Sequence, residues 1–152
     1  LTLYYYYSKY LQNKFFKMLN EQESQEQVNV TRDLTSFSQS IHENNVAKGF
    51  YDKPVEVATH LMLITSELAE ALEADRHSIS ANRLTYEDQI KDGVDFKDAF
   101  KNNIKDSYED EIADAVIRLL DHCGYKGIDI EWHVKQKLRY NKTREIRHGK
   151  KY

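Results

Sequence analysis

The scarcity of proline and glycine is the feature that most constrains the fold of this 152-residue chain. It contains one proline, Pro54, and five glycines, and few stretches alternate between apolar and polar residues as a half-buried strand does. Proline and glycine are the strongest local breaks in regular structure, so a chain with so few of them favours helices. The sequence therefore predicts an all-α fold, a helical bundle of about four core helices.

Capping residues and helix breaks place these helices. Gly49 and Gly124 are the expected ends of the first and third helices, and Asp129 is the expected cap of the fourth. Residues 77–105 are polar with scattered apolar positions, so we expect an insertion there, between the second and third helices, with one short helix. The predicted helices span residues 35–48, 54–76, 106–123 and 129–141.

Two pairs of acids with i,i+3 spacing lie inside predicted helices: Glu67 with Glu70, and Glu111 with Asp114. This spacing puts both carboxylates of a pair on one side of a helix, so two packed helices could direct all of them at one point. Converging negative charges repel one another and need a cation. Oxygen ligands without cysteine favour Mg²⁺, with Mn²⁺ as an alternative, and Mg²⁺ suggests a phosphate substrate.

The two pairs have different surroundings on a helical wheel. Glu67 lies among apolar residues, which is an unusual place for a glutamate. Glu111 and Asp114 lie opposite the apolar arc of their helix, together with Arg118 and Asp121, and that arc taken alone is typical of a solvated face. The alternative interpretation is therefore two ordinary helix surfaces, with an exposed ion pair between Asp114 and Arg118.

Composition limits the classes of protein. A chain of this length with 40% hydrophobic residues can bury one core. Its one cysteine, Cys123, excludes an internal disulfide and a cysteine zinc site, and it fits a cytoplasmic protein. A net charge of −3 makes nucleic acid an unlikely partner, and no apolar run is long enough to predict a membrane span.

The first residues form a segment rich in tyrosine and phenylalanine. Lysines are spread through it, without the basic, apolar and small-residue order of a secretion signal. We expect residues 1–30 to be an extension, to which no motif assigns a role, and residues 31–152 to form the functional domain.

The C-terminal part is strongly basic. Between residues 135 and 151 there is one acid, Glu145, against eight basic residues. A basic segment near an acidic site predicts a phosphate clamp, and the alternatives are a solubilising end or a segment that binds nucleic acid. The basic residues are Lys135, Lys137, Arg139, Lys142, Arg144, Arg147, Lys150 and Lys151.

Several motifs occur in a recognisable order over residues 35–152. They are IHENN at 41–45 with KGF at 48–50, SELAEALEA at 66–74, EIAD at 111–114 with RLLD at 118–121, and KLRYNKTREIRHGK at 137–150. In this order they resemble the MazG-like all-α nucleoside triphosphate pyrophosphohydrolases.

The resemblance implies an enzyme, a hydrolase that works as a homodimer or homotetramer. Such enzymes cleave nucleoside and deoxynucleoside triphosphates to monophosphate and pyrophosphate, often to clear the nucleotide pool. It implies that Glu67, Glu70, Glu111 and Asp114 hold Mg²⁺, and that Glu67 or Glu70 acts as the general base. The implied substrate-binding residues are His42, Lys137, Tyr140, Asn141 and Arg144.

The insertion at residues 77–105 lengthens the usual spacing between the two acidic motifs of the family. It is expected to form a lid, a wall that selects the substrate, or an oligomer contact. Two other functions fit the same residues: a phosphoribosyl-ATP pyrophosphohydrolase, and a helical module that binds nucleotides or self-associates without catalysis.

Overall fold

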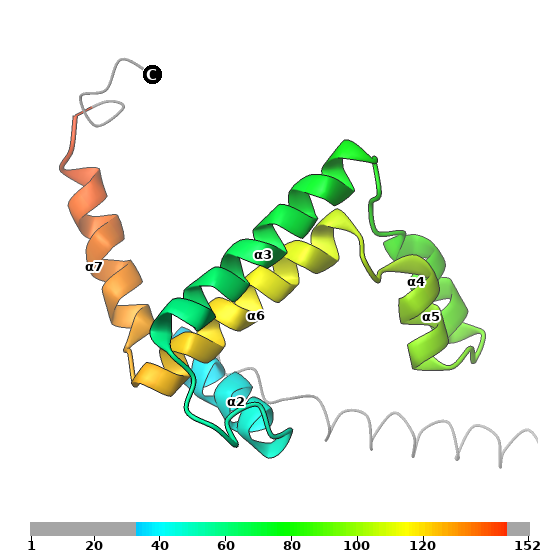
Figure 1. Ribbon diagram of the computed structural model, residues 1–152. Coiled ribbons are helices and arrows are strands. Elements are labelled where there is room, and N and C mark those ends of the chain that lie inside the picture. The colour runs from blue at the N-terminus through cyan, green and yellow to red at the C-terminus, as the bar shows by residue number, and fades with distance from the viewer. Residues whose placement is uncertain (1–32, 146–152) are drawn as a thin grey trace, which may run out of the picture. The chain divides into compact units, whose positions relative to one another are not determined.

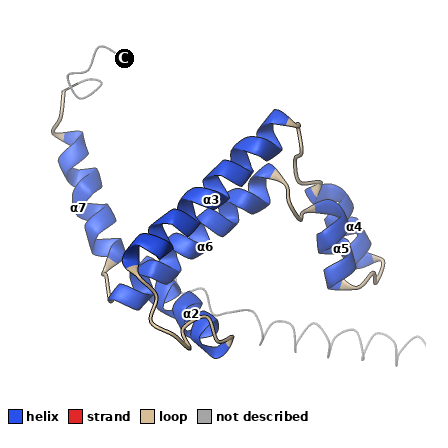
Figure 2. Ribbon diagram, in the orientation of Figure 1, coloured by secondary structure: helices blue, strands red, loops and turns tan. Residues whose placement is uncertain are grey.

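The computed structural model describes residues 33–145, and within that range it contains helices and no strand (Figures 1 and 2). The all-α prediction is therefore confirmed for the described residues, none of whose helices is long and apolar enough to cross a membrane. The predicted boundary between an extension and a domain lies outside that range and stays a prediction. The helices are α2 (Leu34–Ala47), α3 (Val57–Arg76), α4 (Arg83–Lys91), α5 (Phe96–Asn103), α6 (Tyr108–Lys126) and α7 (Ile130–Lys142).

Helix α6 is the centre of the packing. It lies alongside α3 (Figure 1), and α2 packs against it as well. The buried apolar side chains along these contacts are mostly small, among them Ala71 and Ala74 of α3 and Ala115 of α6. Small side chains allow two helices to approach closely, so polar groups on the facing surfaces come within reach of one another.

Two predicted helix boundaries are wrong. The second helix begins at Val57 rather than at Pro54, because Glu56 has an extended backbone with φ −70° and ψ 141°. The third helix continues through Gly124 to Lys126, and Gly127, whose φ of +62° suits glycine, caps it. Gly124 is instead a close crossing point, since a Cβ there would lie 2.7 Å from the carbonyl oxygen of Ser38 in α2.

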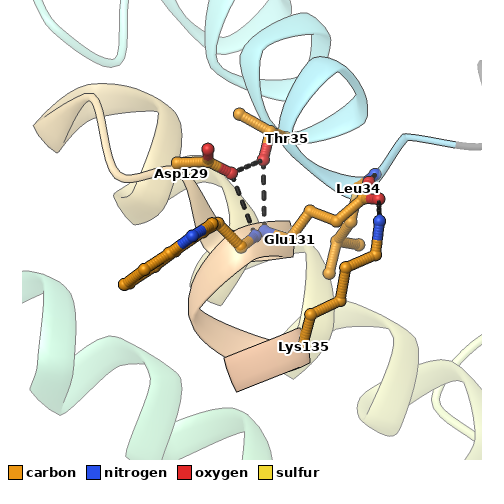
Figure 3. Close-up of polar contacts among 6 residues, drawn as sticks. Leu34, Thr35, Asp129, Glu131 and Lys135 are labelled. Carbon is orange, nitrogen blue, oxygen red and sulfur yellow. Dashed lines mark hydrogen bonds and ion pairs between the residues drawn. The ribbon is translucent and has the colours of Figure 1, made fainter. Parts of the chain in front are cut away.

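The N-terminal ends of α2 and α7 cap each other (Figure 3). Asp129 accepts a hydrogen bond from the backbone N–H of Trp132 at 3.0 Å, as the sequence predicts, and another from the hydroxyl of Thr35 at 2.8 Å. Glu131 of α7 in turn accepts a hydrogen bond from the backbone N–H of Leu34, the first residue of α2, at 2.9 Å. These bonds satisfy N–H groups that a helix cannot satisfy internally, and they tie the two ends together.

The insertion contains two short helices, not one. Asn82 caps α4 by accepting from the N–H of Thr85, and Asp95 caps α5 by accepting from the N–H of Lys97. Gly93, with φ +82°, makes the turn between them. Two turn-forming caps and a glycine therefore split a segment in which scattered apolar residues predict only one helix.

The chain enters and leaves the insertion at one place. The N–H of Tyr108 donates to the carbonyl of Ile79 at 3.0 Å, and the N–H of Asn82 donates to the carbonyl of Asn103 at 2.8 Å. Glu109, in the first turn of α6, accepts from the N–H of Ala81 at 2.8 Å. Backbone bonds thus close the base of the insertion directly beside the helix that carries the second acidic pair.

Candidate metal centre

Packing of α3 on α6 brings acids from both helices together. Glu67 of α3 and Glu111 of α6 are each only 6% exposed. Together with Asp114 they each offer one oxygen, and these oxygens all lie within 4.8 Å of one another. We call these three residues the acidic cluster. Glu70 is one turn further along α3, is exposed, and is not among the three.

The interpretation of the second pair as a solvated helix face is wrong for Glu111, which is buried, whereas Asp114 is exposed. Glu111 and Asp121 lie on the arc that a single-helix wheel assigns to solvent, and both are buried. Val116 and Leu119, on the arc that the wheel assigns to the core, are largely exposed. The wheel fails because it does not include the partner helix that covers the acids.

Burial and neighbouring negative charges both act on the pKa values of the acidic cluster. Burial raises the pKa of Glu111, and the nearby negative charges of Glu70, Glu67 and Asp114 raise it further. The pKa of Asp114 is raised by burial and then by Asp110. In both groups the surroundings oppose the charged form, so a bound cation would favour the ionised carboxylates.

Arg118 is the one cation that the structure places in contact with a member of the acidic cluster, among the residues it describes. Its Nε donates to Oε1 of Glu67 at 2.5 Å, across the α3–α6 interface. The alternative interpretation pairs Arg118 with Asp114 on the same helix. The charge of Arg118 does lower the pKa of Asp114, but burial and the neighbouring acids raise it by more. One guanidinium cannot neutralise three carboxylates, and carboxylate oxygens are ligands that Mg²⁺ and Mn²⁺ accept, so the residues fit a divalent cation.

A second group of acids adjoins the first. Asp106 and Asp110 also offer oxygens within 4.8 Å of one another and of Glu111. The N–H of Asp106 donates to Asp110 at 3.0 Å, which holds the two side by side. The i,i+3 rule overlooks Asp110, but its i,i+4 relation to Asp114 is a signal that could have found it.

His42 lies in a different polar network. Its Nδ1 donates to Asp121 at 3.0 Å, and the hydroxyl of Tyr51 donates to the other oxygen of Asp121 at 2.8 Å. Burial and the bond to Asp121 raise the pKa of Tyr51. Sequence reasoning missed this network, and the expected contact of His42 with a base or sugar stays a prediction.

Two buried histidines continue the network between α3 and α6. The rings of His60 and His122 are 5.1 Å apart, and His60 stacks on Tyr125 at 5.2 Å. Burial lowers the pKa of His122, and so does the neighbouring His60, which favours the neutral ring. This end of the interface is therefore built from aromatic rings beside one hydrogen-bonded carboxylate, and the buried His60 Nε2 and His122 Nδ1 have no hydrogen-bond partner among the described residues.

The predicted phosphate-binding residues lie on and just beyond α7. The Nζ of Lys137 is 5.3 Å from the centroid of the Tyr140 ring, and the guanidinium carbon of Arg144 is 6.0 Å from it. All three are exposed, and Asn141 is half-buried. Neither of the two cavities that reach the acidic cluster is lined by an α7 residue, so the structure does not bring this group to the acids within one chain.

Two cavities meet at Asp114 and Ile117, which line both. The smaller has a volume of about 270 Å³ and the larger about 760 Å³. The smaller is lined by Asn45, Phe50, Tyr51, Val55, His60, Leu63, Arg118 and Asp121 besides the shared residues. The larger is lined by Ala81, Arg83, Tyr86, Glu87, Phe96, Phe100, Ile104, Glu109, Asp110 and Ala113 besides the shared residues.

Comparisons of the chain with family models, with curated proteins and with solved structures found no match. The order of motifs in the sequence and the geometry of the acidic cluster are therefore the two grounds on which a function can be proposed.

Proposed function

We propose that the chain is a Mg²⁺-dependent nucleotide pyrophosphohydrolase that cleaves nucleoside or deoxynucleoside triphosphates to monophosphate and pyrophosphate. One observation carries the proposal: Glu67, Glu111 and Asp114 each place a carboxylate oxygen within 4.8 Å of the others. Buried acids of one sign are costly to assemble unless a cation binds them. Clearance of unwanted nucleotides in the cytoplasm is the role that the motif order and the free, buried Cys123 favour.

In this proposal the acids have two roles, as ligands of the metal and as the general base. Bound Mg²⁺ supplies neutralisation of the phosphate oxygens and orients a water molecule. One oxygen of Glu67 is engaged by Arg118, which leaves the other as a ligand. Glu70 is exposed and outside the three-residue group, yet close enough to raise the pKa of Glu111. Glu70 is therefore the better candidate for the general base that takes the proton of the attacking water.

Self-association fits the exposed apolar surface. Met62 and Leu68 of α3 and Val116 of α6 are each about half exposed or more. Exposed apolar side chains on both helices suit burial in a protein interface, and two α3–α6 pairs packed together make a four-helix bundle. We therefore propose a homodimer or homotetramer, in which Lys137 and Arg144 of a second copy meet the pyrophosphate leaving group.

Product analysis tests the proposal. The full chain is incubated with a panel of nucleoside and deoxynucleoside triphosphates and with phosphoribosyl-ATP, with and without Mg²⁺. The assay separates monophosphate plus pyrophosphate from diphosphate plus phosphate. We expect monophosphate and pyrophosphate only when the metal is present, and light scattering of the same sample should give the mass of two or four chains.

Two variants make the test specific. Glu111→Gln keeps the size of the side chain but removes a charged ligand, so we expect activity to fall by about 100-fold or more. Asp75→Asn changes an exposed carboxylate on α3 outside the acidic cluster and should leave activity unchanged. Full activity of Glu111→Gln, or release of diphosphate in place of pyrophosphate, would refute the proposal.

A further inference from the structure

The larger cavity joins the insertion to the acidic cluster. Its volume is about 760 Å³, within the range of roughly 300–1,000 Å³ that is typical of small-molecule sites. The insertion contributes three aromatic side chains to its wall, Tyr86, Phe96 and Phe100, and α6 contributes Asp110 and Asp114. The cavity therefore has an aromatic side and an acidic side within one space.

We infer that this cavity holds the nucleobase of the substrate, while the phosphates lie at the acidic cluster. The inference rests on the proposed function and adds a specific role for the insertion, which would then select the substrate. A nucleotide complements both sides of the cavity, since its flat aromatic base can stack on aromatic rings and its phosphates can bind carboxylates through a bridging Mg²⁺.

The aromatic wall has groups suited to a base. The rings of Phe96 and Phe100 are 6.0 Å apart and tilted, and Phe96 is 61% exposed, so its face is available for stacking. Arg83 and Glu87, which also line the cavity, form an ion pair at 2.6 Å. Their N–H donors and carboxylate oxygens can bind the polar edge of a base.

The smaller cavity is a poorer fit for a base. Its volume of about 270 Å³ is below the usual range. Two of its polar lining groups, Tyr51 and Asp121, are bonded to each other at 2.8 Å, and Asp121 is buried. The pair of Arg83 and Glu87 in the larger cavity is instead exposed and can exchange partners. Phe50 is the aromatic side chain there that a ligand could reach with least rearrangement, since it is exposed.

Kinetics of three variants with the nucleotide panel test the inference. Phe96→Ala removes an exposed ring and so should not disturb folding. We expect KM to rise by about 10-fold or more, the usual loss for one stacking partner. The KM values for nucleotides with different bases should also become more alike. Leu84→Ala, on the same helix pair but outside the cavity, is the matched control and should behave as wild type. Phe50→Ala reports on the smaller cavity. The melting temperature shift caused by Mg²⁺ alone should be the same in all three.

The outcomes separate the inference from the proposed function. If Phe50→Ala raises KM and Phe96→Ala does not, or if Phe96→Ala changes the oligomer mass instead of KM, the inference is overturned while the function stands. If the wild type cleaves no nucleotide, the function fails, and calorimetry with nucleoside monophosphates decides the inference. Binding that Phe96→Ala weakens would support the cavity as a base site, and no binding by the wild type would overturn it.

Discussion

Helix α6 buries one carboxylate near each end, and the two have opposite surroundings. Asp121, near its C-terminal end, accepts hydrogen bonds from His42 and Tyr51. Glu111, near its N-terminal end, faces Glu67 and other acids, and burial together with these negative charges raises its pKa. Both side chains are similarly inaccessible, so burial alone does not identify a functional acid. The charge of the neighbouring groups is what distinguishes the two positions.

The two carboxylates should therefore contribute differently to the free energy of unfolding. A carboxylate with two donors contributes to the folded state in any solution near neutral pH. A carboxylate among other carboxylates opposes folding until a cation binds, so its contribution depends on the ligand. Substitutions at the two positions should therefore change stability in opposite directions.

The largest expected effect is at Asp121. Asp121→Ala leaves the two donors of His42 and Tyr51 without their acceptor in a buried site, so we expect a loss of about 3 kcal/mol in the free energy of unfolding. Urea unfolding followed by circular dichroism measures it, with exposed Asp75→Ala as the control. A loss below about 0.5 kcal/mol would mean that the network is not structural.

The next effect distinguishes the two ends by their response to metal. Mg²⁺ at about 100 times its dissociation constant should stabilise the wild type by about 2.7 kcal/mol, because it binds only the folded state. Glu111→Gln should lose most of this stabilisation, and Asp121→Asn should keep it. Thermal unfolding at a series of Mg²⁺ concentrations measures the stabilisation of each variant. Equal stabilisation of Glu111→Gln and Asp121→Asn would contradict a metal site at the Glu111 end.

Gly124 gives a smaller effect at the Asp121 end. Gly124→Ala puts a Cβ 2.7 Å from both the Ser38 carbonyl oxygen and the Cβ of His42, so α2 and α6 must separate. Forcing extra volume into such a contact costs about 1–3 kcal/mol. Denaturant unfolding should show this loss while the Mg²⁺ response stays normal. Gly93→Ala is not a suitable control, because Gly93 has a positive φ, so alanine there would strain the backbone without meeting any neighbouring atom.

The smallest effect has the opposite sign. In excess chelator, Glu111→Gln should be more stable than wild type by about 0.5–1 kcal/mol, the usual scale of charge interactions in proteins. The change removes a negative charge that Glu70, Glu67 and Asp114 repel. Thermal unfolding without metal measures it, and a destabilised variant would show that the charged form of Glu111 is favoured.

The pH dependence of that difference follows from the raised pKa of Glu111. A folded-state pKa above the ordinary 4.5 means that the repulsion is present at neutral pH and disappears as the pH falls through the raised value. The advantage of Glu111→Gln over wild type should therefore narrow between neutral pH and about 4.5. An advantage that stays constant over this interval would point to a cause other than ionisation.

Local rules were enough for much of the fold. The scarcity of proline and glycine predicts helices, and Asp129 caps the last of them as expected. Gly124 was misassigned because a helix-ending glycine and a close-packed glycine look alike in sequence. Only the presence of α2 against the same turn of α6 distinguishes them.

The site was partly accessible to the same reasoning. Spacing within a helix selects Glu67, Glu111 and Asp114, because both acids of a pair lie on one side of it. The wheel of α6 could not show that Arg118 bonds to Glu67, which is 51 positions away in sequence. Nor could it show the bond between Asp121 and His42, 79 positions apart. Such partners are set by helix packing, and no local pattern records them.

The closed base of the insertion has a consequence for how this protein can evolve. Backbone hydrogen bonds join Tyr108 to Ile79 and Asn82 to Asn103, so both ends of the insertion are held at the same place. Segments inserted between such anchors can be lengthened, shortened or exchanged while the helices outside keep their places. Changes within this two-helix segment would thus alter the wall of the larger cavity while the carboxylates of α3 and α6 keep their positions.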